Sequence, residues 1–275
     1  MKFVLGVLGV LSFSLASSQR LSDEMKATEE MLAASTKQVN QFFLRFNGEE
    51  DKNGKRLNPK DRNFRSPSLR KNYLPNLFDQ AGSLDPLLAR EFVKLVSDKR
   101  EPRFLNRHEN DWIAEVNVDF VANGRTVSGI LYLRLDQQGK GYAWIIEDVA
   151  FDHLTKNLEK DPEDHSYFIH PMSHELEFMT LRKAFQKDKN AIQYTQKDYQ
   201  PDFLSIFLYE VANGNMTFKT VKDVKFHFFV FEEWYFSLAN FNRPGYNSGW
   251  LINNLFRFEN ENQKRQLKDY VYSKN

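Results

Sequence analysis

Residues 112–135 read WIAEVNVDFVANGRTVSGILYLRL, and this stretch decides the fold class. From residue 112 to residue 120, apolar side chains alternate with Glu115, Asn117 and Asp119, a period of two that predicts a half-buried strand. Asn123-Gly124 is a favoured two-residue hairpin turn, and alternation resumes over residues 126–135. The stretch therefore predicts two antiparallel strands joined by a tight turn.

The sequence on either side extends this hairpin into an α+β arrangement. A further strand is expected from Tyr142 to Phe151, after a turn at Gln138 to Gly141. Upstream of residue 112, apolar residues recur at the spacing of a helix. A long amphipathic helix is predicted over Asp23 to Phe46, with shorter helices over 68–79 and 86–97. The apolar stripe of the long helix contains Met25, Leu32, Val39, Phe42 or Phe43, and Phe46. Helices followed by an antiparallel meander place the chain in the α+β class.

The second half of the chain repeats this order in shorter form. Helices are predicted over 173–186 and 201–212, followed by strands over 221–231, 234–241 and 249–258. A charged, irregular stretch at 153–172 is interpreted as a linker, and the charged tail at 259–275 has a weak helical pattern. The predicted organisation is thus one unit over 19–152, a linker, a second unit over 173–258, and a tail.

Two segments of the halves can be aligned with each other. Leu131–Leu135 matches Trp234–Leu238, and Trp144–Val149 matches Trp250–Leu255. Chance similarity between two aromatic hairpins is one explanation. The same order of helices, strand, hairpin and Trp-led strand in both halves favours a duplicated unit.

This pattern resembles the NTF2-like (SnoaL-like) superfamily, in which helices pack against a strongly bent antiparallel sheet to form a cone. The resemblance covers residues 22–152 well and residues 173–258 less well. The resemblance implies a tandem pair of cone units. The chain is also similar to exported bacterial members of that superfamily. Because the superfamily includes isomerases, dehydratases, binding proteins and scaffolds, the resemblance implies no particular activity.

The N-terminus has the layout of a secretory signal peptide. Lys2 precedes an uncharged apolar run from Phe3 to Ala16, and Ala16 and Ser18 have the small-x-small spacing of a cleavage site. We expect cleavage near Ser18 and a periplasmic or secreted mature chain. The run is shorter than the roughly 20 residues that a membrane span needs. A lipid anchor at the cleavage site would need a cysteine, and the chain has none. No membrane span is therefore expected in the mature chain.

Composition excludes several classes of function. The 38 basic and 37 acidic residues nearly balance, which argues against a nucleic-acid binder. The absence of cysteine excludes a thiol nucleophile and a thiolate metal site. No phosphate-binding glycine motif occurs, so no cofactor is expected.

One histidine-rich stretch is a candidate metal site. His165, His170, His174 and Glu175 lie close together in the sequence, but the zinc-protease helix motif would need a second histidine at Phe178. We predict no metal.

The candidate site residues cluster on the third strand. Strict alternation puts Glu147 and Asp148 on opposite faces, and puts Asp148 on the same face as Tyr142, Trp144 and Ile146. An aromatic setting of this kind suits a small apolar ligand.

The predicted ligand-binding residues are Tyr132, Tyr142, Trp144 and Asp148. In the alternative catalytic interpretation, burial raises the pKa of Asp148 for general-base chemistry, with His108 as its partner. The matching position in the second unit is Asn254, which cannot abstract a proton and argues against catalysis.

The sequence therefore favours a non-catalytic binding or scaffold protein whose partner is a small apolar ligand or an envelope protein. An acid–base isomerase, dehydratase or hydrolase is the alternative, and a glycan-binding surface protein is a third possibility. Several strands are apolar on both faces, so each face needs a cover, either from this chain or from a partner.

Overall fold

The computed structural model describes residues 39–51, 53–109, 111–156, 158, 191–196, 198–245 and 247–272. The predicted signal peptide at 1–18 lies outside the described residues. So do the start of the first predicted helix, most of the predicted linker, and the predicted helix at 173–186. The histidine-rich stretch at 165–175 also lies outside them.

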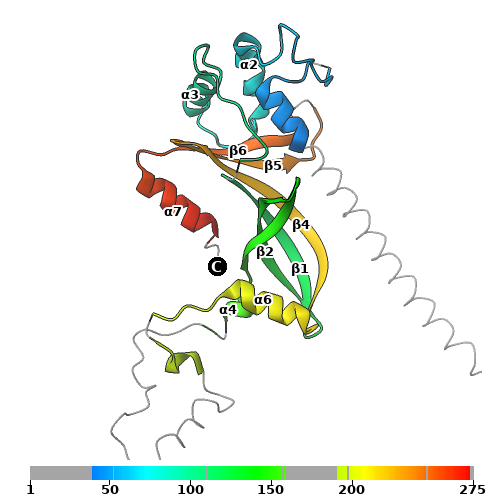
Figure 1. The fold of residues 1–275 in the computed structure, drawn as a ribbon, viewed down its shortest axis with the longest axis vertical. Coiled ribbons are helices and arrows are strands. Elements are labelled where there is room, and N and C mark those ends of the chain that lie inside the picture. The colour runs from blue at the N-terminus through cyan, green and yellow to red at the C-terminus, as the bar shows by residue number, and fades with distance from the viewer. Residues whose placement is uncertain are drawn as a thin grey trace, which may run out of the picture.

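A six-stranded antiparallel sheet with helices packed on it organises the fold and confirms the α+β class (Figure 1). The strands are β1 (Trp112–Ala122), β2 (Arg125–Gln138), β3 (Gly141–Ala150), β4 (Met216–Phe231), β5 (Trp234–Phe241) and β6 (Gly249–Arg257). The β1–β2 turn is at Asn123 and Gly124, as predicted, and both residues have positive φ, 50° and 71°. Positive φ at both positions is what a tight hairpin turn requires. β4 begins five residues earlier than expected, at Met216 rather than Val221.

All six strands belong to one sheet, in the order β3-β2-β1-β4-β5-β6. β1 pairs with β4 along its whole length, from Trp112 opposite Phe228 to Ala122 opposite Met216. The strand order is therefore symmetrical about the β1–β4 pair, and each half of the chain contributes three consecutive strands. The sheet curves strongly, with β4 running through the bend (Figure 1).

One face of the sheet, called here the first face, carries Ala114, Leu133, Ile146, Phe226 and Leu238, which the register places side by side. Its β4–β6 part is covered by four helical segments. These are residues 39–47, α2 (Pro67–Tyr73), η1 (Leu74–Leu77) and α3 (Pro86–Val96). Aromatic rings fill this interface: Phe46 stacks on Phe236 at 6.2 Å, and Phe228 stacks on Phe236 at 4.6 Å. These helices and strands enclose the largest hydrophobic cluster among the described residues.

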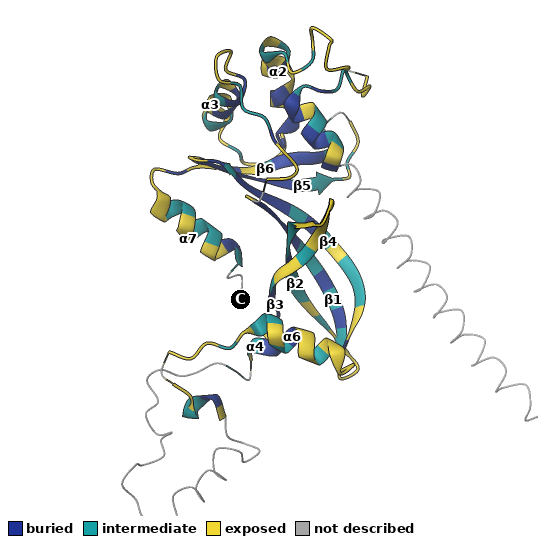
Figure 2. Cartoon of the chain, viewed as in Figure 1, coloured by how far each residue is buried: buried dark blue, intermediate teal, exposed yellow. Residues whose placement is uncertain are grey.

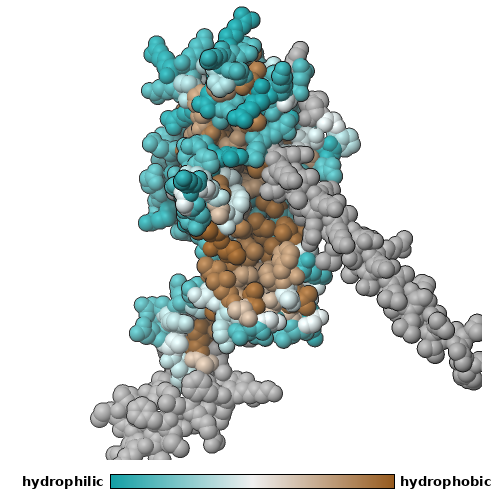
Figure 3. Space-filling view, turned by 45° about the vertical axis from the view of Figure 1, so that its right-hand side comes forward, coloured by the Kyte–Doolittle hydropathy of each residue, from teal (hydrophilic) through white to brown (hydrophobic). Residues whose placement is uncertain are grey.

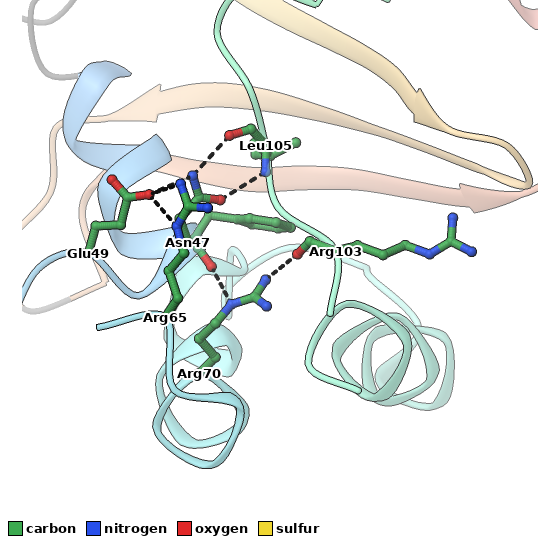
Figure 4. Close-up of polar contacts among 7 residues, drawn as sticks. Asn47, Glu49, Arg65, Arg70, Arg103 and Leu105 are labelled. Carbon is green, nitrogen blue, oxygen red and sulfur yellow. Dashed lines mark hydrogen bonds and ion pairs between the residues drawn. The ribbon is translucent and has the colours of Figure 1, made fainter. Parts of the chain in front are cut away.

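A buried arginine joins the helices above the sheet (Figure 4). Arg70 is 1 % exposed, and its guanidinium donates to the carbonyls of Phe46 (3.0 Å), Val96 (2.7 Å) and Arg103 (2.5 Å). Burial lowers the pKa of Arg70 to about 10, with the neighbouring Arg65 as a second cause. Because these carbonyls belong to three separate segments, Arg70 fixes how the segments sit against one another.

The far end of the first face is closed by α4 (Asp152–Thr155) and α6 (Phe203–Ala212). Phe207 of α6 contacts Phe120 and Phe151, each at 5.3 Å. The predicted helix over 201–212 is confirmed, and Asp202 caps it by accepting from the Ser205 amide. A short 3-10 turn, η3 (Ala191–Tyr194), lies nearby in the sequence.

The opposite side of the sheet, the second face, is covered by α7 (Glu261–Tyr272), which confirms the helical pattern in the charged tail. Val271 of α7 is buried among Ile113, Tyr132, Phe229 and Tyr235. Figure 2 shows the buried strands between the upper helices and α7, with exposed residues concentrated on the outer sides of the helices. None of the described helices is long and apolar enough to cross a membrane.

Candidate functional site

An irregularity in β3 decides which face each candidate residue occupies. Leu133 lies opposite Ile146, but the next residue of β2, Tyr132, lies opposite Asp148, so Glu147 is an extra residue on β3. Such a bulge interrupts the alternation of side chains. Asp148 consequently lies on the second face with Tyr132, whereas Tyr142, Trp144 and Ile146 lie on the first. The expectation that Asp148 shares the face of those three residues is wrong.

Glu147 also lies on the second face. Its carboxylate accepts from the Arg134 guanidinium at 3.0 Å and from the Tyr272 hydroxyl of α7 at 2.6 Å. The expected separation of Glu147 and Asp148 onto opposite faces is therefore wrong as well, and the bulge is again the reason.

The first face has an open apolar area between the upper helices and α6, visible as a brown surface in Figure 3. Its β2–β3 part, called here the open patch, consists of Leu133, Leu135, Tyr142, Trp144 and Ile146. The last three are 42 %, 39 % and 37 % exposed. Monomeric proteins expose contiguous apolar patches of this kind mainly where something binds.

Aromatic contacts border the open patch at its upper end. His108 stacks on Tyr142 with ring centroids 4.1 Å apart, and Trp112 meets Trp144 edge to face at 5.1 Å. The structure thus brings together three of the predicted residues: Tyr142 and Trp144 of the ligand-binding set, and His108 of the catalytic alternative.

A hollow of about 820 Å³ lies beside His108, between residues 39–47 and the loop at 104–109. Arg56, Arg65 and Arg107 line it together with Glu49 and Glu109. Arg65 is paired with Glu49 at 2.6 Å, and burial raises the pKa of Glu109, with Asp111 as a second cause. The hollow therefore mixes both signs of charge.

The second face holds a buried polar chain that sequence reasoning missed. His227 Nδ1 lies 2.8 Å from the Tyr235 hydroxyl, and His227 Nε2 lies 2.9 Å from the Glu115 carboxylate. All three side chains are buried, and Lys225 Nζ lies 3.6 Å from the other Glu115 oxygen. The acid and the histidine are 112 residues apart in the sequence, so no local motif marks them. The one signal available was Glu115 itself, a charge in mid-strand on the same side as the apolar Ile113.

Tyr132 lies next to this polar chain and is fully buried. Its ring is 5.1 Å from that of Tyr272, and its hydroxyl has no hydrogen-bond partner in the part of the chain that the structure describes. Burial raises the pKa of Tyr132, and the charges of Glu115 and Asp148 add to the shift. The phenol therefore stays protonated at neutral pH and does not serve as a base.

Asp148 has the raised pKa that the catalytic alternative requires. Burial is the main cause, and the charges of Asp202 and Glu147 contribute, while the Val149 amide acts in the opposite direction. The proposed partner His108, however, contacts Tyr142 on the first face, and Asp148 lies on the second. The two groups stand on opposite sides of the sheet and cannot act together on one substrate.

Comparison with known proteins adds nothing to the geometry. No protein-family model matches the chain, and no curated protein or solved structure is detectably similar to it.

Proposed function

We propose that this is an exported, non-catalytic binding or scaffold protein that holds an apolar ligand or the apolar surface of an envelope partner against the open patch. The observation that carries the proposal is the exposure of Tyr142, Trp144 and Ile146 on the sheet face whose two ends are covered by helices. Burying such side chains is favourable by roughly 25 cal/mol per Å² of apolar surface. A partner that covers them thus gains binding free energy without any new charge pair.

The separation of Asp148 from His108 supports a binding role over the acid–base alternative. The chemistry proposed for that pair needs both groups within reach of the same substrate. The open patch itself offers aromatic and aliphatic side chains, which suit an apolar occupant.

We also propose that the two halves of the chain are duplicated units related to the NTF2-like cone. A second bulge supports this: Ser237 lies opposite Asn254 and Leu238 opposite Ile252, which leaves Asn253 as an extra residue on β6. Asn253 is the residue that corresponds to Glu147 when Trp250 is aligned with Trp144. Bulges at matching positions are typical of related strands.

Binding of a neutral apolar probe, N-phenyl-1-naphthylamine, tests the proposed function. We expect Ile146→Asp to abolish the binding-induced fluorescence of the probe, because it places a charge in the middle of the open patch. Leu87→Asp is the matched control, since Leu87 is an exposed leucine on α3, outside the patch. Equal probe binding by the two variants would overturn the proposal.

A further inference from the structure

The open patch meets the hollow beside His108 at a single loop. His108 lines the hollow of about 820 Å³, and its ring stacks on Tyr142 of the open patch at 4.1 Å. Arg107 also lines the hollow, and its carbonyl accepts from the Trp112 indole at 3.1 Å. Trp112 in turn contacts Trp144 of the open patch at 5.1 Å. The charged hollow and the apolar patch therefore adjoin at His108.

The loop between these two surfaces is held by hydrogen bonds to the helix at 39–47. The Asn47 side chain accepts from the Leu105 amide at 2.8 Å and donates to the Leu105 carbonyl at 2.9 Å (Figure 4). The Arg107 guanidinium donates to the Asn40 side chain at 2.6 Å. Because these bonds join the loop to the helix, the wall of the hollow is formed before a ligand enters, and less freedom is lost on binding.

Positive charge exceeds negative charge in the hollow. Arg56, Arg65 and Arg107 line it, against Glu49 and Glu109. Arg65 is neutralised by Glu49 at 2.6 Å, whereas Arg56 and Arg107 have no ion pair with any residue that the structure describes. Burial raises the pKa of Glu109, which disfavours its charged form. The two arginines are therefore available to an anion, and a guanidinium binds a carboxylate well through paired hydrogen bonds.

The open patch suits a different chemical group. Its five side chains carry no charge, and Tyr142 and Ile146 are about 13 Å apart along β3, at roughly 3.3 Å per residue. An unbranched hydrocarbon chain fits such a row, and each methylene that it buries strengthens binding roughly fourfold. A molecule that occupies both surfaces thus has a long apolar tail and an anionic head.

We infer that the occupant of the open patch is a long-chain fatty acid, with its acyl chain along Trp144 and Ile146 and its carboxylate on Arg107 and Arg56. This inference rests on the proposed function and deepens it, because it names the chemical class of the ligand. Charge complementarity at the two arginines selects a fatty acid over a neutral molecule of the same length.

Competition with N-phenyl-1-naphthylamine at pH 8 and low ionic strength tests this. The competitors are dodecanoate and 1-dodecanol, kept below their aggregation limits, which have the same chain length and differ in the charge of the head group. We expect dodecanoate to displace the probe at a lower concentration, by roughly fivefold for each arginine that contacts it. Added salt should reduce this preference, because it screens the two exposed arginines.

Substitutions of the arginines locate the head group. Arg107→Gln should lower the affinity for dodecanoate about fivefold and leave that for 1-dodecanol unchanged, and the further change Arg56→Gln should abolish the preference. Arg107→Lys keeps the charge and should keep most of the preference. Arg125→Gln is the matched control, since Arg125 is exposed at the start of β2, at the opposite end of that strand from Gln137, the residue that lies opposite Tyr142.

The outcomes separate this inference from the proposed function. Equal affinities for dodecanoate and 1-dodecanol, or a preference that the double arginine variant retains, would overturn the inference, while binding of the probe and of 1-dodecanol would leave the proposed function standing. Dodecanoate that binds without displacing the probe would also overturn the inference, because it would lie away from the open patch. If the probe, the alcohol and the acid all fail to bind, the proposed function falls and the inference falls with it.

Discussion

Glu147 and Asn253 occupy the same place in their strands: each is the extra residue of a bulge in the last strand of its half of the sheet. The residues that follow the two bulges make equivalent hydrogen bonds. Each of Asp148 and Asn254 accepts from the backbone amide of the next residue, at 2.8 Å and 3.1 Å. The bulge residues themselves differ in chemistry. Glu147 binds the Tyr272 hydroxyl of α7, whereas Asn253 accepts from the Ser237 hydroxyl of the neighbouring strand.

The bond between Tyr272 and Glu147 is expected to hold the end of α7 on the second face. Tyr272→Phe removes this hydrogen bond and keeps the ring against Tyr132. We therefore expect the free energy of unfolding to fall by about 1 kcal/mol and amide exchange over residues 261–272 to become faster. Hydrogen–deuterium exchange measures this, and Tyr270→Phe, at an exposed position of the same helix, is the control. Unchanged exchange in Tyr272→Phe would show that apolar packing alone holds α7.

Arg70 is expected to be the most sensitive charged position in the upper helices. Arg70→Met removes the guanidinium donor of the Phe46, Val96 and Arg103 carbonyls, of which the Val96 carbonyl keeps the Arg103 amide, and we expect a loss of roughly 2–5 kcal/mol in the free energy of unfolding. Arg70→Lys should not restore stability, because an ammonium cannot reproduce the planar donor geometry. Urea unfolding of both variants, with the exposed Lys71→Met as control, checks this. A stability of Arg70→Met equal to that of Lys71→Met contradicts it.

Tyr235 is expected to make the protein sensitive to alkali. Burial raises its pKa from 10.0 to about 12, so the folded state keeps the phenol proton over a range in which the unfolded state loses it. The resulting stabilisation is complete below pH 10 and is lost as the pH rises towards about 12. Tyr235→Phe should therefore show a shallower loss of stability over this range.

At pH 8 the same substitution should cost about 1–3 kcal/mol of stability, because it removes the buried hydrogen bond between the Tyr235 hydroxyl and His227 Nδ1. Thermal unfolding at a series of pH values measures both effects. Parallel stability curves for the two proteins between pH 10 and pH 12 would show that Tyr235 contributes nothing to the alkaline loss.

Asp148→Asn tests what the half-buried carboxylate on the second face contributes to stability and to the open patch. Because burial raises the pKa of Asp148, its stabilising contribution is present at low pH and is lost as the pH rises through the raised value. An amide stays neutral, so Asp148→Asn should be at least as stable as the unmodified protein at pH 7. Asn254 accepts the equivalent hydrogen bond from the Leu255 amide, so an asparagine is compatible with this bond.

Since Asp148 lies on the opposite face from Trp144, the same variant should bind the apolar probe with unchanged affinity. Fluorescence titration with N-phenyl-1-naphthylamine provides the measurement. Weakened probe binding in Asp148→Asn would mean that this carboxylate contributes to the site.

Features that depend only on neighbouring residues could be predicted from the sequence. Alternation of apolar and polar side chains predicted the strands, Asn123-Gly124 predicted the first hairpin turn, and the helical pattern over 86–97 predicted α3. Each of these reflects a local conformational preference, which a short window of sequence contains in full.

Which residues come into contact depends on the assembled sheet and could not be predicted from local sequence. The pairing of β1 with β4 joins strands about 100 residues apart and brings Glu115 to His227. The bulge at Glu147 moves Asp148 away from Trp144 and towards Tyr132. Strand pairing is selected by the packing of whole faces, and a one-residue shift reverses every side chain beyond it. The sequence pattern of β3 therefore predicted a strand. The contacts of the assembled sheet determine which of its side chains form the site.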